Sequence, residues 1–368
     1  MPLSRRRFLG RLGLTCGAGL LHLTGLGLLL TGCDKDGDPD SMEAPAQQPE
    51  PWQPAYIRLE DEGLLEGRIQ QAQEHLRECD LCPRRCGVNR LAGEQGFCRA
   101  PSKVMVYSYV PHFGEELPLV GRKGSGTIFF SNCNLRCVFC QNWPLAHEGR
   151  GQEFADQELA EMMLHLERMG CHNINLVTPT HVMPHILNAT RIALKKGLRL
   201  PLCYNTSGYE RPEMIRLLEG IVDIYLPDMK FMDGERASQF NLAQAHDYPK
   251  YTKKAILEMH RQVGDLVTDR QGFARRGILV RHLVMPNRVA GTGEFVNWVA
   301  QNLSPRTYVN IMSQYRVEFM AFEYEEIARG ITPEEYVEAM DWAQEAGLTN
   351  LDKRSLAQLE VNRRRMGR

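Results

Sequence analysis

Cys133-Asn134-Leu135-Arg136-Cys137-Val138-Phe139-Cys140 places three cysteines in one short stretch, with spacings of three and then two residues. Cysteines this close in sequence converge on a metal centre much more readily than they form disulfides with one another. Three thiolates hold three irons of a [4Fe–4S] cube and leave the fourth iron open to a substrate or cofactor. Two alternatives stay open: a zinc knuckle, and a cluster whose fourth ligand lies elsewhere in the chain.

The residues around this cysteine loop alternate between strand-like and helix-like patterns. The loop directly follows the apolar run Thr127-Ile128-Phe129-Phe130, and amphipathic segments separate the later runs. Such alternation predicts parallel strands with helices packed on them. The predicted helices include one that Asp156 caps and one that starts at the capping box Thr332-Pro333-Glu334-Glu335 and ends at Gly347. The predicted strands are 126–132, 173–179, 201–206, 221–227, 278–285 and 307–312.

Six β/α units over roughly 220 residues predict an α/β fold, a partial (β/α)6 relative of the TIM barrel. In such barrels, functional groups gather at the C-terminal ends of the strands. Asp228 and Lys230 are two apart on one strand end and therefore share a face. Read singly, they could be a surface ion pair worth under about 1 kcal/mol. The polar residues that we expect at these strand ends are Thr178, Thr180, Asn205, Ser207, Asp228, Lys230 and Arg281.

The Cys-x3-Cys-x2-Cys loop, with aromatic Phe139 before its last cysteine, resembles the signature of the radical S-adenosylmethionine (SAM) enzymes. Over about residues 75–350 the chain is most similar to the activating enzymes of glycyl radical enzymes, above all relatives of pyruvate formate-lyase activating enzyme. The resemblance implies a radical SAM partial barrel with Cys133, Cys137 and Cys140 as the ligands of a catalytic [4Fe–4S] cluster. It also implies SAM bound at the open iron and an external one-electron reductant. The chemistry implied is reductive cleavage of SAM to a 5′-deoxyadenosyl radical, which abstracts hydrogen from a glycyl radical enzyme or another protein.

The same resemblance implies which strand-end residues bind SAM. Asp228-Met229-Lys230 is similar to the family's Asp-Leu-Lys, Asn205-Thr206-Ser207-Gly208 to its Asp-Thr-Asn-Gly turn, and Arg281 to its strand-five arginine. Two departures stand out. Thr178-Pro179-Thr180 replaces the usual Gly-Gly-Glu that holds the SAM amino group, and Asn205 replaces an aspartate, which weakens a cation site there.

A second group of cysteines lies closer to the N-terminus. Cys79, Cys82, Cys86 and Cys98 have spacings that suit either a tetrahedral zinc site or a second iron–sulfur cluster. The sequence does not separate these two possibilities. Cys171 and Cys203 have no spaced partner, and we expect both to be small buried side chains without a role in binding.

The first 33 residues read as an export signal. Ser4-Arg5-Arg6-Arg7-Phe8-Leu9 resembles a twin-arginine signal and is followed by an apolar stretch over 12–30. Leu30-Thr31-Gly32-Cys33 resembles a lipobox, which implies cleavage before Cys33 and its lipidation. We therefore expect a membrane-anchored lipoprotein that faces the periplasm. The alternatives are an uncleaved membrane anchor and, if the signal is not used, a cytoplasmic protein.

Composition sets the remaining limits. The chain has 368 residues, of which 43% are hydrophobic and 24% charged, and its net charge is −1. These values exclude a disordered or polytopic membrane protein and give no basic field for nucleic acid. Two other functions stay open. The protein could be a radical SAM enzyme that acts on another peptide or on a small molecule, or a non-catalytic exported lipoprotein that carries a metal or an iron–sulfur cluster. The expected organisation is an export signal at 1–33, an acidic Pro-rich tether at 34–56, a Cys-rich region at 57–125, the barrel at 126–350 and a basic tail at 351–368.

Overall fold

The computed structural model describes residues 52–367. The predicted signal, the predicted lipidation site Cys33 and the tether up to residue 51 lie outside the described residues. The tether was expected to run through residue 56, but Ala55 and Tyr56 already belong to helix α1 (Ala55–Asp61). The Ala55 N–H donates to Asp223, 2.8 Å away, and the buried Tyr56 hydroxyl donates to the Leu200 carbonyl at 2.9 Å. Within the described part, no helix is long and apolar enough to span a membrane.

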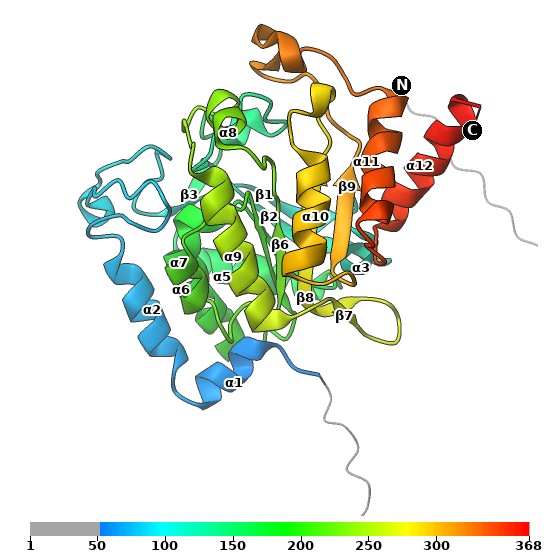
Figure 1. Ribbon diagram of the computed structural model, residues 1–368. Helices are drawn as coiled ribbons and strands as arrows, with labels where there is room; N and C mark the ends of the chain where they lie inside the picture. Colours follow the sequence, from blue (N-terminus) through cyan, green and yellow to red (C-terminus); the bar gives the residue numbers. More distant parts are fainter. Residues whose placement is uncertain (1–51, 368) are drawn as a thin grey trace, which may run out of the picture. The chain divides into compact units, whose positions relative to one another are not determined.

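Six strands form a parallel sheet in which neighbours in sequence are neighbours in space. This order, with helices between the strands, confirms the predicted α/β partial barrel (Figure 1). Val177, Asn205 and Leu226 pair across three adjacent strands. The residues after these strands therefore emerge at one edge. The six strands are β2 (Ser125–Phe130), β4 (Ile174–Val177), β5 (Leu202–Thr206), β6 (Ile224–Pro227), β8 (Ala274–Leu283) and β9 (Tyr308–Met312).

Three further strands run antiparallel to the neighbours that they pair with, and the sequence did not predict them. β1 (Val104–His112) pairs with β2 and covers the free edge of the parallel sheet. β3 (Gln152–Phe154) pairs with β1, and β7 (Val267–Thr268) pairs with the first half of β8. Covering the edge with β1 removes an exposed row of unpaired backbone groups.

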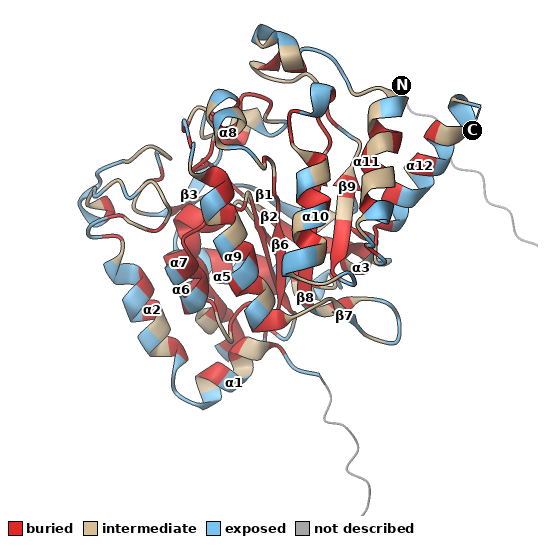
Figure 2. Ribbon diagram, viewed as in Figure 1, coloured by how far each residue is buried: buried red, intermediate tan, exposed pale blue. Residues whose placement is uncertain are grey.

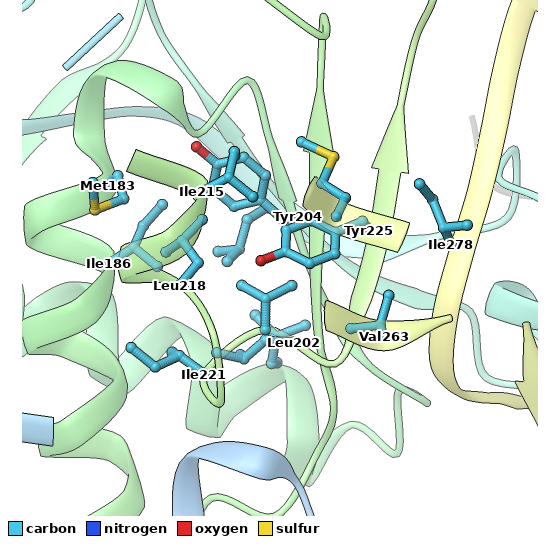
Figure 3. Packing of buried hydrophobic residues seen from close by; sticks show 14 of the residues in the cluster. Met183, Ile186, Leu202, Tyr204, Ile215, Leu218, Ile221, Tyr225, Val263 and Ile278 are labelled. Carbon is cyan, nitrogen blue, oxygen red and sulfur yellow. The ribbon is translucent and has the colours of Figure 1, made fainter. Parts of the chain in front are cut away.

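Helices cover the outer face of the parallel strands, and their buried sides face the sheet (Figures 1 and 2). Tyr204 and Tyr225 of the sheet lie in one apolar cluster with Ile186 and Ile215 from two of these helices (Figure 3). The covering helices are α5 (Asp156–Arg168), α6 (Met183–Lys195), α7 (Pro212–Leu217), α9 (Tyr248–Val263), α10 (Thr292–Asn302) and α11 (Pro333–Glu345). The remaining α-helices are α2 (Leu65–Glu74), α3 (Leu117–Val120), α4 (Trp143–Ala146), α8 (Gly234–Gln239) and α12 (Lys353–Arg365).

Helix ends test the capping predictions. Thr332 and Glu335 form the predicted capping box of α11, with Thr332 Oγ1 accepting from the Glu335 N–H. Asp156, in contrast, is not the cap of α5 but its first residue. Its carboxylate accepts from Asn188 at 2.7 Å and lies 2.8 Å from His185 Nδ1, so it joins α5 to α6.

The predicted basic tail at 351–368 is wrong, because α12 occupies most of this segment and packs against the barrel. Asp352 caps α12 by accepting from the Arg354 N–H at 2.7 Å, and Leu359 is buried on its inner side. Arg363 donates to Asp341 of α11 at 2.6 Å. The three arginines near the C-terminus are therefore part of a packed amphipathic helix.

Candidate cluster and cofactor site

The three spaced cysteines lie on the loop that follows β2, at the C-terminal edge of the parallel strands. Cys133, Cys137 and Cys140 all line one cavity. The chain around Phe240 and Met320 fixes the loop through backbone bonds on either side of Cys137. The Val138 N–H donates to Phe240 O at 3.0 Å, the Leu242 N–H donates to Arg136 O at 2.9 Å, and the Met320 N–H donates to Val138 O at 2.9 Å.

The thiols of this loop are shielded from water. Burial raises the pKa of Cys137 above its ordinary value and raises that of Cys140 to about 12, while the Lys230 ammonium acts in the opposite direction on both. Such thiols stay protonated at neutral pH unless a metal displaces the proton. Within residues 52–367, no three Cys, His, Asp or Glu side chains converge as the ligands of one ion do. A [4Fe–4S] cluster makes a different demand, because each thiolate binds its own iron.

The structure brings most of the predicted strand-end residues into the same cavity as the cysteines. They come from four successive parallel strands, β4, β5, β6 and β8, or from the residues directly after them. The cavity lining therefore combines three thiols with an array of charged, amide and hydroxyl groups. These residues are Thr178, Asn205, Ser207, Asp228, Lys230 and Arg281.

A network of buried charges centres on Asp228. Arg281 Nε donates to Asp228 Oδ1 at 2.7 Å, and Lys230 Nζ donates to Oδ2 at 2.5 Å. Arg281 Nη2 also donates to Asn205 Oδ1 at 2.6 Å. Burial by itself would raise the pKa of Asp228, but the two cations lower it below its ordinary value, so the carboxylate stays ionised.

The turn after β5 places Ser207 beside this network. Tyr248 donates its hydroxyl to Ser207 O at 2.8 Å and accepts from the Lys230 N–H at 2.9 Å, which joins the two strand ends. Gly208 has φ +83, and a Cβ there would lie 2.3 Å from the Asp228 carbonyl oxygen, so only glycine fits. The buried Ser207 Oγ has no hydrogen-bond partner among the described residues, which leaves it available to a ligand.

Thr180 was expected to contact the cofactor, and its position does not support that role. It is buried outside the cavity, and its hydroxyl donates to Glu210 Oε1 at 2.5 Å. Thr206 donates to the same oxygen at 2.5 Å, so Glu210 joins the loops after β4 and β5. Burial raises the pKa of Glu210 to about 7 although both hydroxyls lower it.

Sequence reasoning missed two buried acidic residues behind Arg281. Glu115 Oε2 lies 3.4 Å from Arg281 Nη1, and Glu116 Oε1 accepts from Asn310 at 2.8 Å. Burial raises the pKa of Glu116, which Arg281 opposes. Both residues follow β1, and the sequence pattern gave no signal for this strand. The adjacent pair of acidic residues just before an apolar segment was the only available hint.

The second group of cysteines gathers at a separate cavity. Cys79, Cys82, Cys86 and Cys98 line it together, as their spacing predicts. Cys171 and Cys203 are buried, as expected. Neither lines this cavity or the cavity at residues 133–140, here called the catalytic loop.

The fold and the thiol-lined cavity define a class of protein. The model of the Radical SAM superfamily matches residues 127–287, which span the catalytic loop, the turn after β5 and the strand end that carries Asp228 and Lys230. Residues 127–287 therefore form a domain of the radical SAM superfamily, whose members use a [4Fe–4S] cluster and SAM. The donor set fits both groups, because one cavity is lined by three thiols, an ionised carboxylate, two cations and a hydroxyl without a partner among the described residues.

Relatives of this chain include two proteins of Methanocaldococcus jannaschii. The uncharacterized protein MJ0674 is 32% identical over 295 residues, which cover 77% of this chain and 80% of the relative. The uncharacterized protein MJ0808 is 25% identical over 159 residues, which cover 38% of this chain and 46% of the relative.

Solved structures similar to part of this chain include two enzymes. The [FeFe]-hydrogenase maturase HydG has a TM-score of 0.41 and 12% identity, over 60% of this chain and 49% of its own. Methylornithine synthase (PylB) has a TM-score of 0.37 and 14% identity, over 60% and 67%. Scores this low do not bear on function.

Proposed function

We propose that this protein is a radical SAM enzyme that abstracts a hydrogen atom from a partner protein, in the manner of a glycyl radical enzyme activating protein. The observation that carries the proposal is the single cavity shared by Cys133, Cys137 and Cys140 with Asp228, Lys230 and Arg281. When bound, the cluster and SAM supply one-electron cleavage of the sulfonium to a 5′-deoxyadenosyl radical. An external one-electron reductant is a necessary partner.

The residues of the cavity wall have distinct roles in this proposal. Asp228 is buried and ionised. In this proposal the hydroxyl or ammonium groups of SAM donate hydrogen bonds to its carboxylate, in competition with Arg281 and Lys230, which donate to it in this structure. Arg281 and Lys230 bring positive charge to the wall and suit the SAM carboxylate. Ser207 Oγ has no hydrogen-bond partner among the described residues, so it suits a ribose hydroxyl or another polar group of SAM. Alanine at Asp228 should weaken SAM binding at least tenfold, and unchanged affinity would remove Asp228 from this role.

Apolar packing behind the loop supports an environment that excludes water. Phe139 packs edge-on against Phe231 with ring centroids 5.9 Å apart, and it lies 6.1 Å from the Tyr315 ring. Leu145, Ala146 and Val177 also line the cavity. Such a wall limits side reactions of a reactive intermediate with solvent.

The preference for an activase-type reaction rests on the resemblance of Asp228-Met229-Lys230 and the turn at 205–208 to the activase motifs. The replacement of Gly-Gly-Glu by Thr178-Pro179-Thr180 means that the SAM amino group needs another partner. Thr178 lines the cavity, whereas Thr180 does not. We assign that contact to Thr178.

We also propose that the protein is exported and anchored to a membrane by a lipid on Cys33. This part of the proposal is based only on the sequence motifs at residues 4–9 and 30–33.

The test is anaerobic reconstitution with iron and sulfide, reduction, addition of SAM and chromatography for 5′-deoxyadenosine. Product from wild type and from Cys171→Ser, a buried cysteine outside both groups, but none from Cys137→Ala, is the expected result. A glycyl radical signal on a co-purified protein would support the activase-type reaction. SAM cleavage without any protein radical would favour another radical SAM substrate, and no cleavage at all would favour the non-catalytic lipoprotein.

A further inference from the structure

Residues 79–98, here called the knuckle, fold into a tight loop around four thiols. The Cys79 N–H donates to Val88 O and the Gly87 N–H donates to Cys79 O, both at 2.9 Å, which closes the loop. Gly96 passes so near Cys86 that a Cβ there would lie 2.8 Å from the Cys86 sulfur. Figure 1 shows the knuckle as the light-blue loops that follow α2.

The catalytic loop itself forms part of the wall around these four thiols. Asn134, which follows Cys133, lines the cavity, and so does His181 from the segment after β4. Arg84 of the knuckle donates to the Ala243 carbonyl at 2.5 Å, and its guanidinium lies 3.8 Å from the centre of the Phe97 ring. Arg136 of the catalytic loop lies 5.4 Å from the same ring. The two groups of cysteines are therefore neighbours that share a wall.

Several polar atoms at this cavity are buried without a hydrogen-bond partner in the described residues. They are Nε of Arg84, Nε of Arg90, Oδ1 of Asn134 and Nδ1 of His181, and all four residues line the cavity. Unpaired buried polar groups are costly, so their concentration at one place indicates a polar occupant.

Arg90 indicates the charge of that occupant. Its side chain is 1% exposed, and its Nη1 and Nη2 donate to the carbonyls of His181 and Pro101 at 2.6 and 2.9 Å. These partners carry no negative charge, whereas a buried cation needs a nearby anion. Four thiolates bound to a metal would supply negative charge directly at this cavity, which the four cysteines line.

The hydrogen-bonding groups at the cavity favour a cluster over a single ion. A [4Fe–4S] cube offers four sulfides as acceptors beside its four thiolates, whereas a zinc site offers the thiolates alone. The four thiols line one cavity together with Arg84 and Arg90, whose buried Nε atoms have no partner among the described residues. We propose that Cys79, Cys82, Cys86 and Cys98 bind a second [4Fe–4S] cluster, which lies against the catalytic loop. This inference goes beyond the proposed function and requires no reaction of SAM.

The test uses the full chain with Cys133→Ala, Cys137→Ala and Cys140→Ala combined, reconstituted anaerobically with iron and sulfide. The knuckle is untouched in this variant, so its folding does not limit the result. We expect about four irons and four sulfides per chain, and an electron paramagnetic resonance (EPR) signal after dithionite reduction that SAM does not change. One zinc without sulfide, or no bound metal, would overturn the inference.

The converse variant, Cys82→Ser with Cys98→Ser, should lose this SAM-insensitive signal and keep the SAM-responsive one. Cys171→Ser is the matched control and should keep both. Because the two cysteine groups share a wall, the reduced wild type should show spin coupling, which means a spectrum broader than the sum of the two variants. A spectrum equal to that sum would contradict the placement. The iron content of the triple variant and 5′-deoxyadenosine formation by wild type are separate readouts, so either proposal can fail without the other.

Discussion

Asp228→Asn tests the buried charge network at the centre of the site. Asparagine keeps the shape of the side chain but removes the charge that faces Arg281 Nε at 2.7 Å and Lys230 Nζ at 2.5 Å. Two largely shielded cations, with side chains that are 15% and 18% exposed, then lose their shared carboxylate. Breaking a buried ion pair from one side costs about 3–5 kcal/mol. Arg281 keeps Asn205 and the more distant Glu115, so we expect a loss in unfolding free energy near the lower end, about 3 kcal/mol.

The assay is urea unfolding at pH 7, followed by circular dichroism, on anaerobically reconstituted protein. The matched control is Glu338→Gln, which breaks an ion pair with Arg288 whose side chains are 32% and 67% exposed. That loss should stay under about 1 kcal/mol. The double variant Asp228→Asn/Lys230→Met should be more stable than Asp228→Asn alone, because it removes one of the two uncompensated cations. The single variant Lys230→Met completes this double-mutant cycle. If the double variant lost as much free energy of unfolding as the two single variants together, the reasoning would be refuted.

Two further predictions concern the turn after β5. Burial raises the pKa of Glu210 from 4.5 to about 7, so the neutral acid is the form that the fold favours, and the stability that it contributes is lost as pH rises through this range. Wild type should lose about 3 kcal/mol between pH 4.5 and pH 8 relative to Glu210→Gln, and parallel stability curves of the two proteins would contradict this. Gly208→Ala should lower the free energy of unfolding by about 2 kcal/mol or more, because the added Cβ would lie 2.3 Å from the Asp228 carbonyl oxygen. The matched control is Gly197→Ala, which is also at positive φ but has open space around it. This control should lower the free energy of unfolding by only about 1–2 kcal/mol. Equal losses in thermal unfolding would argue against the close contact at Gly208.

The sequence predicted those parts of the site that depend on spacing along one element. The three cysteines sit in one loop after a strand, and the strand ends carry Asn205, Asp228 and Arg281 to one edge because parallel strands align there. This much follows from periodicity and local spacing.

The sequence did not predict contacts that depend on where an irregular segment turns. Thr178 and Thr180 look equivalent in sequence, but a 3-10 turn at 180–182 buries Thr180 against Glu210. Glu115 and Glu116 reach Arg281 and Asn310 only because β1 pairs antiparallel with β2, across a register shift between Val106 and Ser108. The charged run at the C-terminus hides an amphipathic helix, because its few apolar positions are widely spaced.

The most direct test of the account is EPR spectroscopy of the reduced protein before and after addition of SAM. If the cluster on Cys133, Cys137 and Cys140 keeps an open iron, SAM should change the signal, and Cys137→Ala should remove the SAM-responsive component while leaving the rest. A spectrum that SAM leaves unchanged in the wild type would mean that the polypeptide ligates every iron, and it would contradict the assignment of this cavity to SAM.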